Sequence, residues 1–170
     1  MADHLNNIER TLIDNLRNKD EEAGHAWGLG EVTVFGQFPE TEDVKYPCVV
    51  VELVANGIEE QFLGQSVSTA ASNDVKGEIY GMAFNIHCAC DIESTLSTGD
   101  GAGFKQRRLI NYMMLNVANI LMDCDFQGAT PSTEVVQRYH TGFRQINYNA
   151  DLEVWSATTG MVIVFVNSRS

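Results

Sequence analysis

The sequence predicts a single α+β domain, with a mixed, mostly antiparallel sheet and two main helices packed on one face. Two segments carry apolar residues at helical spacing, and several others show the alternating or continuous apolar patterns of strands. The strands come in runs rather than in strict alternation with helices, which favours the α+β class. The 170 residues suit one domain, spanning 1–170. The expected order is α-β-β-β-α-β-β, with the number of strands open by one.

The first third of the chain predicts one helix and two strands. Residues 3–18 indicate an amphipathic helix, and 31–38 indicate a strand that ends in a turn-rich segment. Residues 47–55 read PCVVVELVA, a run rich in β-branched residues that predicts a central strand. Residues 56–78 are polar and rich in Gly, Ser and Asn, so we expect a long loop there. The apolar stripe of the helix consists of Leu5, Ile8, Leu12 and Leu16.

The middle of the chain predicts a strand, a loop and a second helix. In residues 78–90 the even positions from Tyr80 onward are apolar, which is typical of a half-buried antiparallel strand. Residues 91–104 are rich in small residues and predict a flexible loop into the helix at 105–122. The apolar stripe of this helix includes Met114 and Leu115, so we expect the helix to be nearly engulfed.

The end of the chain returns to strands. We expect them at 133–143, at 144–156 as one long and bent strand, and at 159–166.

Charge and hydropathy exclude two broad classes. Eleven Lys and Arg against 23 Asp and Glu give a net charge of −12, whereas specific nucleic-acid binding requires a basic surface. No apolar run approaches the ~18 residues of a membrane span. The segment MADHLNNIER lacks the apolar centre of a secretory signal. We therefore expect neither specific nucleic-acid binding nor membrane association.

The four cysteines predict core residues rather than a metal site. Cys88 and Cys90 follow a histidine, but structural zinc needs a second ligand pair, and the sequence has none at suitable spacing. In a strand both residues point to one face and continue its apolar series. We expect Cys88 and Cys90 to be buried and reduced, and we expect no metal or other cofactor.

No motif indicates an enzyme. His87 is expected to be a surface or helix-packing residue rather than a catalyst. Gly99, Gly101 and Gly103 precede a helix, but their spacing departs from both the dinucleotide and the P-loop patterns. The chain has no nucleophile elbow, so we expect no enzymatic activity, although a triad assembled from distant residues stays open.

One short motif and the order of segments resemble a known family. Tyr46 to Val51 read Tyr-Pro-Cys-Val-Val-Val, an alternating strand ends at Cys90-Asp91, and a helix from Lys105 precedes the terminal strands. Over nearly the whole chain this resembles the tail terminator (tail completion) proteins of long-tailed bacteriophages and related archaeal tailed viruses.

The resemblance implies a structural virion protein without catalytic residues. It implies a homohexameric ring that terminates the tail tube and joins it to the head–tail neck, with DNA passing through the lumen. The implied partners are further copies of the chain, the tail tube protein and a neck or head–tail connector protein. The implied location is the tail or neck of the virion, after assembly in the host cytoplasm. A strongly acidic chain suits such a ring, because a basic lumen would hold the DNA that it must release.

Six residues are candidates for contacts between subunits. The helix dipole disfavours the cations Arg107 and Arg108 at a helix start, so a carboxylate from a partner would stabilise them, unless both are simply solvated. The other four belong to the two predicted loops: Gln65, Ser68, Asn73 and Asp100. Three alternatives remain: another neck or head-completion protein, a small-ligand-binding α+β domain, or an enzyme whose site is assembled from scattered residues.

Overall fold

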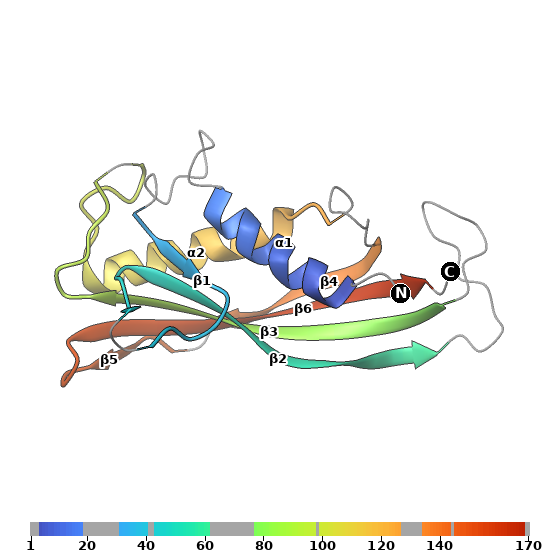
Figure 1. The fold of residues 1–170 in the computed structure, drawn as a ribbon. Helices are drawn as coiled ribbons and strands as arrows, with labels where there is room; N and C mark the ends of the chain where they lie inside the picture. Colours follow the sequence, from blue (N-terminus) through green and yellow to red (C-terminus); the bar gives the residue numbers. More distant parts are fainter. Residues whose placement is uncertain are drawn as a thin grey trace.

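Two helices cover one face of a six-stranded mixed sheet in the computed structural model (Figure 1). The structure describes residues 4–18, 31–40, 43–61, 77–97, 99–126, 134–143 and 145–168. The helices are α1 (His4–Asn18) and α2 (Gln106–Asp123). The strands are β1 (Thr33–Phe35), β2 (Cys48–Gln61), β3 (Gly77–Asp91), β4 (Glu134–Phe143), β5 (Asn147–Asn149) and β6 (Val154–Ser168). This confirms the predicted fold class, and the additional strand lies within the range left open.

The sheet has one long regular ladder, β3–β6, with an irregular ladder on either side of it. Its order is β1-β2-β3-β6-β4, and β5 pairs with the start of β6. β1 runs parallel to β2, whereas the other pairs are antiparallel. β3 pairs with β6 without a register shift over its whole length, whereas the β2–β3 and β4–β6 ladders each contain two shifts. Such bulges bend a strand and are common near sheet edges.

The predicted alternation in β3 separates the two faces of the sheet. Met82, Phe84, Ile86 and Cys88 are fully buried on the face that the helices cover. Their partners in the register include Met161 and Ile163 of β6, which lie on the same face. The odd-numbered residues of β3 point to the opposite face, and Figure 1 shows no helix over it. The sheet is therefore covered by helices on one side alone.

Helix α2 lies on the sheet as predicted, but its outer side is open. Leu109, Met113, Val117 and Leu121 are buried against the strands and α1. The expectation that the helix is nearly engulfed was wrong, because Leu115 is 56% exposed and Met122 is also exposed. The reason is that the sheet and α1 cover two sides of the helix, and no described layer covers its third side.

Three segment boundaries differ from the sequence prediction. The loop expected at 56–78 is shorter, because β2 continues to Gln61 and β3 starts at Gly77. Backbone pairing between these strands does not require apolar side chains, and in Figure 1 this end of the sheet extends beyond the helices. β1 is shorter than the predicted strand at 31–38. The segment 144–156 is not one strand, since β5 turns back into β6.

Candidate subunit interface

The outward surface of α2 differs in charge from the rest of the molecule. The segment 101–122 contains Lys105, Arg107 and Arg108 and no carboxylate, so all 23 Asp and Glu residues lie elsewhere in the chain. The side chains of all three cations are exposed. Between Arg108 and Asp123 the exposed residues of the helix are uncharged: Asn111, Leu115, Asn119 and Met122. In a chain of net charge −12, this surface is cationic at one end and apolar at its centre.

The two predicted interface arginines have different surroundings. The guanidinium of Arg108 lies 3.9 Å from the centre of the Phe104 ring, and this ring packs edge-on against Tyr112. A cation over an aromatic face is stabilised by the ring quadrupole. Arg107 is exposed, and among the described residues no carboxylate lies within ion-pair distance of either arginine. Within the described part of the chain, both guanidinium groups therefore lack a carboxylate partner.

The segment before α2 is held by hydrogen bonds and is not the flexible entry that we predicted. Asp91 Oδ1 accepts hydrogen bonds from the backbone N–H and the hydroxyl of Ser94 at 2.7 and 2.6 Å. The carboxylate of Glu31 accepts from the N–H of Ser97, at 2.9 and 2.8 Å to its two oxygens. Leu96 is buried in the core. A buried side chain and side-chain acceptors for these N–H groups fix the path of the segment.

Asp100 is exposed within this segment, and it lies close to Tyr112 of α2. Partial burial raises the pKa of the Tyr112 phenol, and the nearby Asp100 carboxylate raises it further. The structure thus brings Asp100, Arg107 and Arg108 to the start of α2. The other three candidates, Gln65, Ser68 and Asn73, lie outside the described residues, so their part in an interface stays a prediction.

The β5–β6 turn is an exposed apolar tip that the sequence analysis missed. Leu152 is 67% exposed and lies between the exposed carboxylates Asp151 and Glu153. Asn149 Oδ1 accepts hydrogen bonds from the N–H groups of Asp151 and Leu152, at 3.0 and 3.1 Å, which sets the turn. Asn149 with Asp151 two positions later was the available turn signal, but the apolar residues on both sides favoured one continuous strand.

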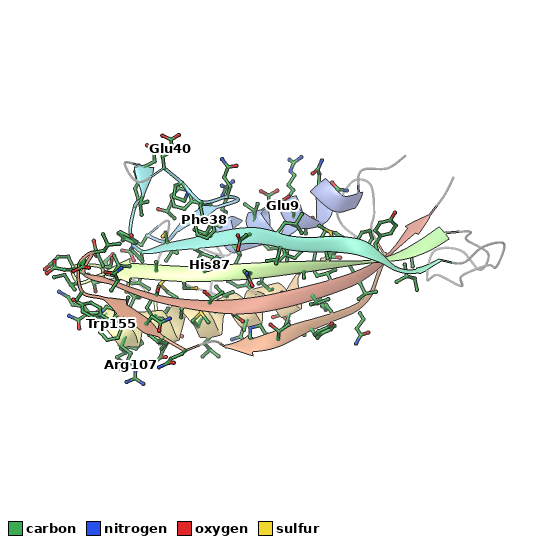
Figure 2. All side chains as sticks on the ribbon, turned by 90° about the horizontal axis from the view of Figure 1, so that it is seen from below. Glu9, Phe38, Glu40, His87, Arg107 and Trp155 are labelled. Carbon is green, nitrogen blue, oxygen red and sulfur yellow. The ribbon has the colours of Figure 1, made fainter. Side chains whose placement is uncertain are left out.

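This hairpin lies at the end of the molecule where α2 begins. Figure 2 labels Arg107 and Trp155 at the same end, and Figure 1 places β5 beneath the start of α2. The ring of Tyr148 on β5 packs against the ring of Trp155 on β6, with 4.8 Å between the ring centres. The packed rings of Tyr148 and Trp155 and the hydrogen bonds of Asn149 in the turn hold Leu152 in a defined position.

The face of the sheet away from the helices carries a polar cluster. His87 Nδ1 lies 2.9 Å from Thr158 Oγ1, and His87 Nε2 lies 3.1 Å from Glu52 Oε2. Asn85 donates a hydrogen bond to the same Glu52 oxygen at 3.3 Å, and the ring of Phe38 lies 5.0 Å from the imidazole (Figure 2). His87 is half-buried and hydrogen-bonded across three strands on the face without helices, which fits the surface alternative of the prediction and not the helix-packing alternative.

The order Thr158–His87–Glu52 is that of a nucleophile, a base and a carboxylate. A catalytic site of this kind also needs N–H donors for a developing oxyanion. The β3–β6 register continues unbroken through His87 and Thr158, so the backbone groups of these strands belong to the ladder. The arrangement therefore supports hydrogen bonding across the sheet better than acyl transfer.

The expected burial of the cysteines is confirmed. All four cysteines are free and buried. Burial raises the pKa of Cys48 to about 11 and of Cys90 to about 12, and burial also raises the pKa of Cys88. Among the described residues no three His, Cys, Asp or Glu side chains gather in a way that would hold a metal ion.

Within the described part of the chain, neither helix has the length and apolar character of a membrane span. In comparisons with known proteins, no family model matches the chain, and no curated protein is significantly similar to it.

Proposed function

We propose that this protein is a structural virion protein that forms a ring, terminates the tail tube of a tailed virus and joins it to the head–tail neck. The single observation that carries the proposal is the order and placement of the elements. This order resembles the plan of tail terminator proteins: an N-terminal helix, the Tyr-Pro-Cys-Val-Val-Val entry to β2, the alternating β3, α2 and the terminal strands.

The exposed surface supports an assembled state. Large apolar side chains are exposed in four regions: Leu115 and Met122 on α2, Tyr148 and Leu152 at the hairpin, Phe38 and Val54 on the β1–β2 side of the sheet, and Tyr139 on the edge strand β4. Exposed apolar groups in several regions suit a subunit with more than one neighbour. The net charge of −12 suits a lumen through which DNA must slide without being held.

The test of the proposal is the location and mass of the protein. We expect gold-labelled antibody to mark the head-proximal end of the tail, and light scattering to show a mass that rises with concentration toward a closed oligomer. The proposal would be contradicted if the particle contained the protein as isolated monomers. It would also be contradicted if the protein belonged to an enzyme complex outside the particle.

A second candidate, a hydrolase, rests on the Thr158–His87–Glu52 contacts. It predicts that activated esters are cleaved by the purified protein and that Thr158→Ala and His87→Ala both abolish the cleavage. The hydrolase function would be excluded if the unmodified protein and both variants hydrolysed the esters at the same background rate.

A further inference from the structure

We propose that neighbouring copies of this chain associate by placing the β5–β6 hairpin tip of one copy on the outward surface of α2 of the next. The hairpin tip is defined as Asp151, Leu152 and Glu153. The outward surface of α2 comprises Arg107, Arg108, Leu115 and Met122. This inference deepens the proposed function, because it names the surfaces through which a ring would close.

The two surfaces are complementary in charge and alike in their apolar content. The hairpin tip has two exposed carboxylates around Leu152, the most exposed large apolar residue of the described chain. The outward surface of α2 has two exposed guanidinium groups and the exposed Leu115, and the helix contains no carboxylate before Asp123. An apolar contact flanked by opposite charges is typical of interfaces, where charges steer the encounter and apolar residues supply the buried area.

Within the described part of the chain, these charged groups form no ion pair. The described ion pairs are Arg10–Asp14 on α1 and His87–Glu52 on the open face of the sheet. Among the described residues, no ion pair joins Arg107 or Arg108 to Asp151 or Glu153, although the β5–β6 turn and the start of α2 lie at the same end of the molecule (Figure 1). α2 lies above the sheet in Figure 1, whereas the hairpin lies at its lower side. The hairpin and the start of α2 thus lie on different sides of the sheet, so each can face a separate neighbour.

A second copy is the occupant that the charges favour. Chains of net charge −12 repel one another, so any contact between copies must be locally complementary. The start of α2, with its two exposed guanidinium groups, can receive the carboxylates of a neighbouring copy. Because the hairpin and the helix are different surfaces, the contact is heterologous, and repeated heterologous contacts produce a ring when the rotation closes.

The experiment reverses the charges on each surface in turn. One variant carries Asp151→Arg and Glu153→Arg, and the other carries Arg107→Glu and Arg108→Glu. We expect each alone to associate about tenfold or more weakly in sedimentation velocity over a wide concentration range. Mixing the two variants, or combining the four substitutions in one chain, should restore association, because opposite charges then face each other again.

The matched control for the α2 variant is Arg10→Glu with Lys45→Glu, which changes the net charge equally at exposed cations outside the proposed surface. It should associate as the unmodified protein does, and thermal melts should show that every variant is folded. A monomeric wild-type protein at all concentrations, or a loss that neither mixing nor the fourfold variant restores, would overturn the inference.

Failure of this inference can be distinguished from failure of the proposed function. If antibody marks a ring at the tail end while the charge reversals change nothing, the function stands and the interface is wrong. If the reversals impair and then restore association but the protein is absent from tails, the interface stands and the function is wrong.

Discussion

His87 on β3 joins Glu52 on β2 through a 3.1 Å contact between Nε2 and Oε2 on the face of the sheet that lacks helices. The hydrogen bond from His87 lowers the pKa of the Glu52 carboxyl below its ordinary value of 4.5. The hydrogen bond from Asn85 lowers this pKa further, by a smaller amount. Because Nε2 donates to Glu52 in the neutral imidazole, Nδ1 accepts from the Thr158 hydroxyl. The two hydrogen bonds of His87 therefore link β2, β3 and β6.

This contact should make stability depend on acid pH. Because the pKa of Glu52 is lower in the folded than in the unfolded state, its ionised carboxylate stabilises the folded protein above pH 4.5. This stabilisation is lost as the pH falls through the pKa of Glu52 in the folded state. We expect Glu52→Gln to lower the urea midpoint at pH 7 and to have little effect at pH 3. The exposed Glu93→Gln controls for the loss of one carboxylate. A Glu52→Gln penalty that persists unchanged at pH 3 would contradict the interpretation.

The cysteines should be unreactive in the native protein. Burial raises the pKa values of Cys48, Cys88 and Cys90, so almost no thiolate forms at pH 8, and reagent access is also blocked. We expect Ellman's reagent to modify none of them rapidly in the folded protein and to modify four thiols per chain after denaturation. Rapid reaction before unfolding would show that the strand face opens.

Val117 and Leu115 provide a matched pair on α2. Val117 is fully buried, and Val117→Asp would bury an unpaired charge, which should cost about 3 kcal/mol or more of unfolding free energy. Leu115 is exposed, so Leu115→Asp should leave the melt nearly unchanged while weakening association between copies. Circular dichroism melts of the two variants check the difference. Equal destabilisation by both would mean that the outer side of α2 is covered within the monomer.

Gly101 lies directly beneath the ring of Tyr112. A Cβ atom added at Gly101 would lie 2.5 Å from Tyr112 Cε1, which is closer than packed atoms approach. We expect Gly101→Ala to destabilise the protein by about 1–3 kcal/mol or to displace the Tyr112 ring, visible as a change in its fluorescence or proton chemical shifts. Ala102→Ser, at the exposed neighbouring position, should change neither. An unchanged stability and an unchanged ring environment in Gly101→Ala would contradict this packing.

Local periodicity was sufficient for the fold class and for much of the core. The alternation in β3 predicted which side chains are buried, including Cys88 and Cys90, and the helical spacing in α2 predicted Val117 against the sheet. These patterns depend on residues a few positions apart, so they can be read from the chain alone.

The candidate interface was predicted in part. Arg107, Arg108 and Asp100 were selected from the sequence, and the structure places all of them at the start of α2. The hairpin tip at Leu152 was missed, because its apolar flanks resemble one continuous strand until the pairing of β5 with β6 separates them.

The sequence by itself determined the types of elements, their order and the apolar face of each, because the repeat of side chains along a helix or strand is a local property. Only the tertiary structure decided that Leu115 is left exposed, that His87 meets Glu52 and Thr158, and that the hairpin lies at the end where α2 begins. These features depend on which strands pair and on which side a helix packs. Such choices join residues far apart in the chain and are decided by the packing of the whole domain.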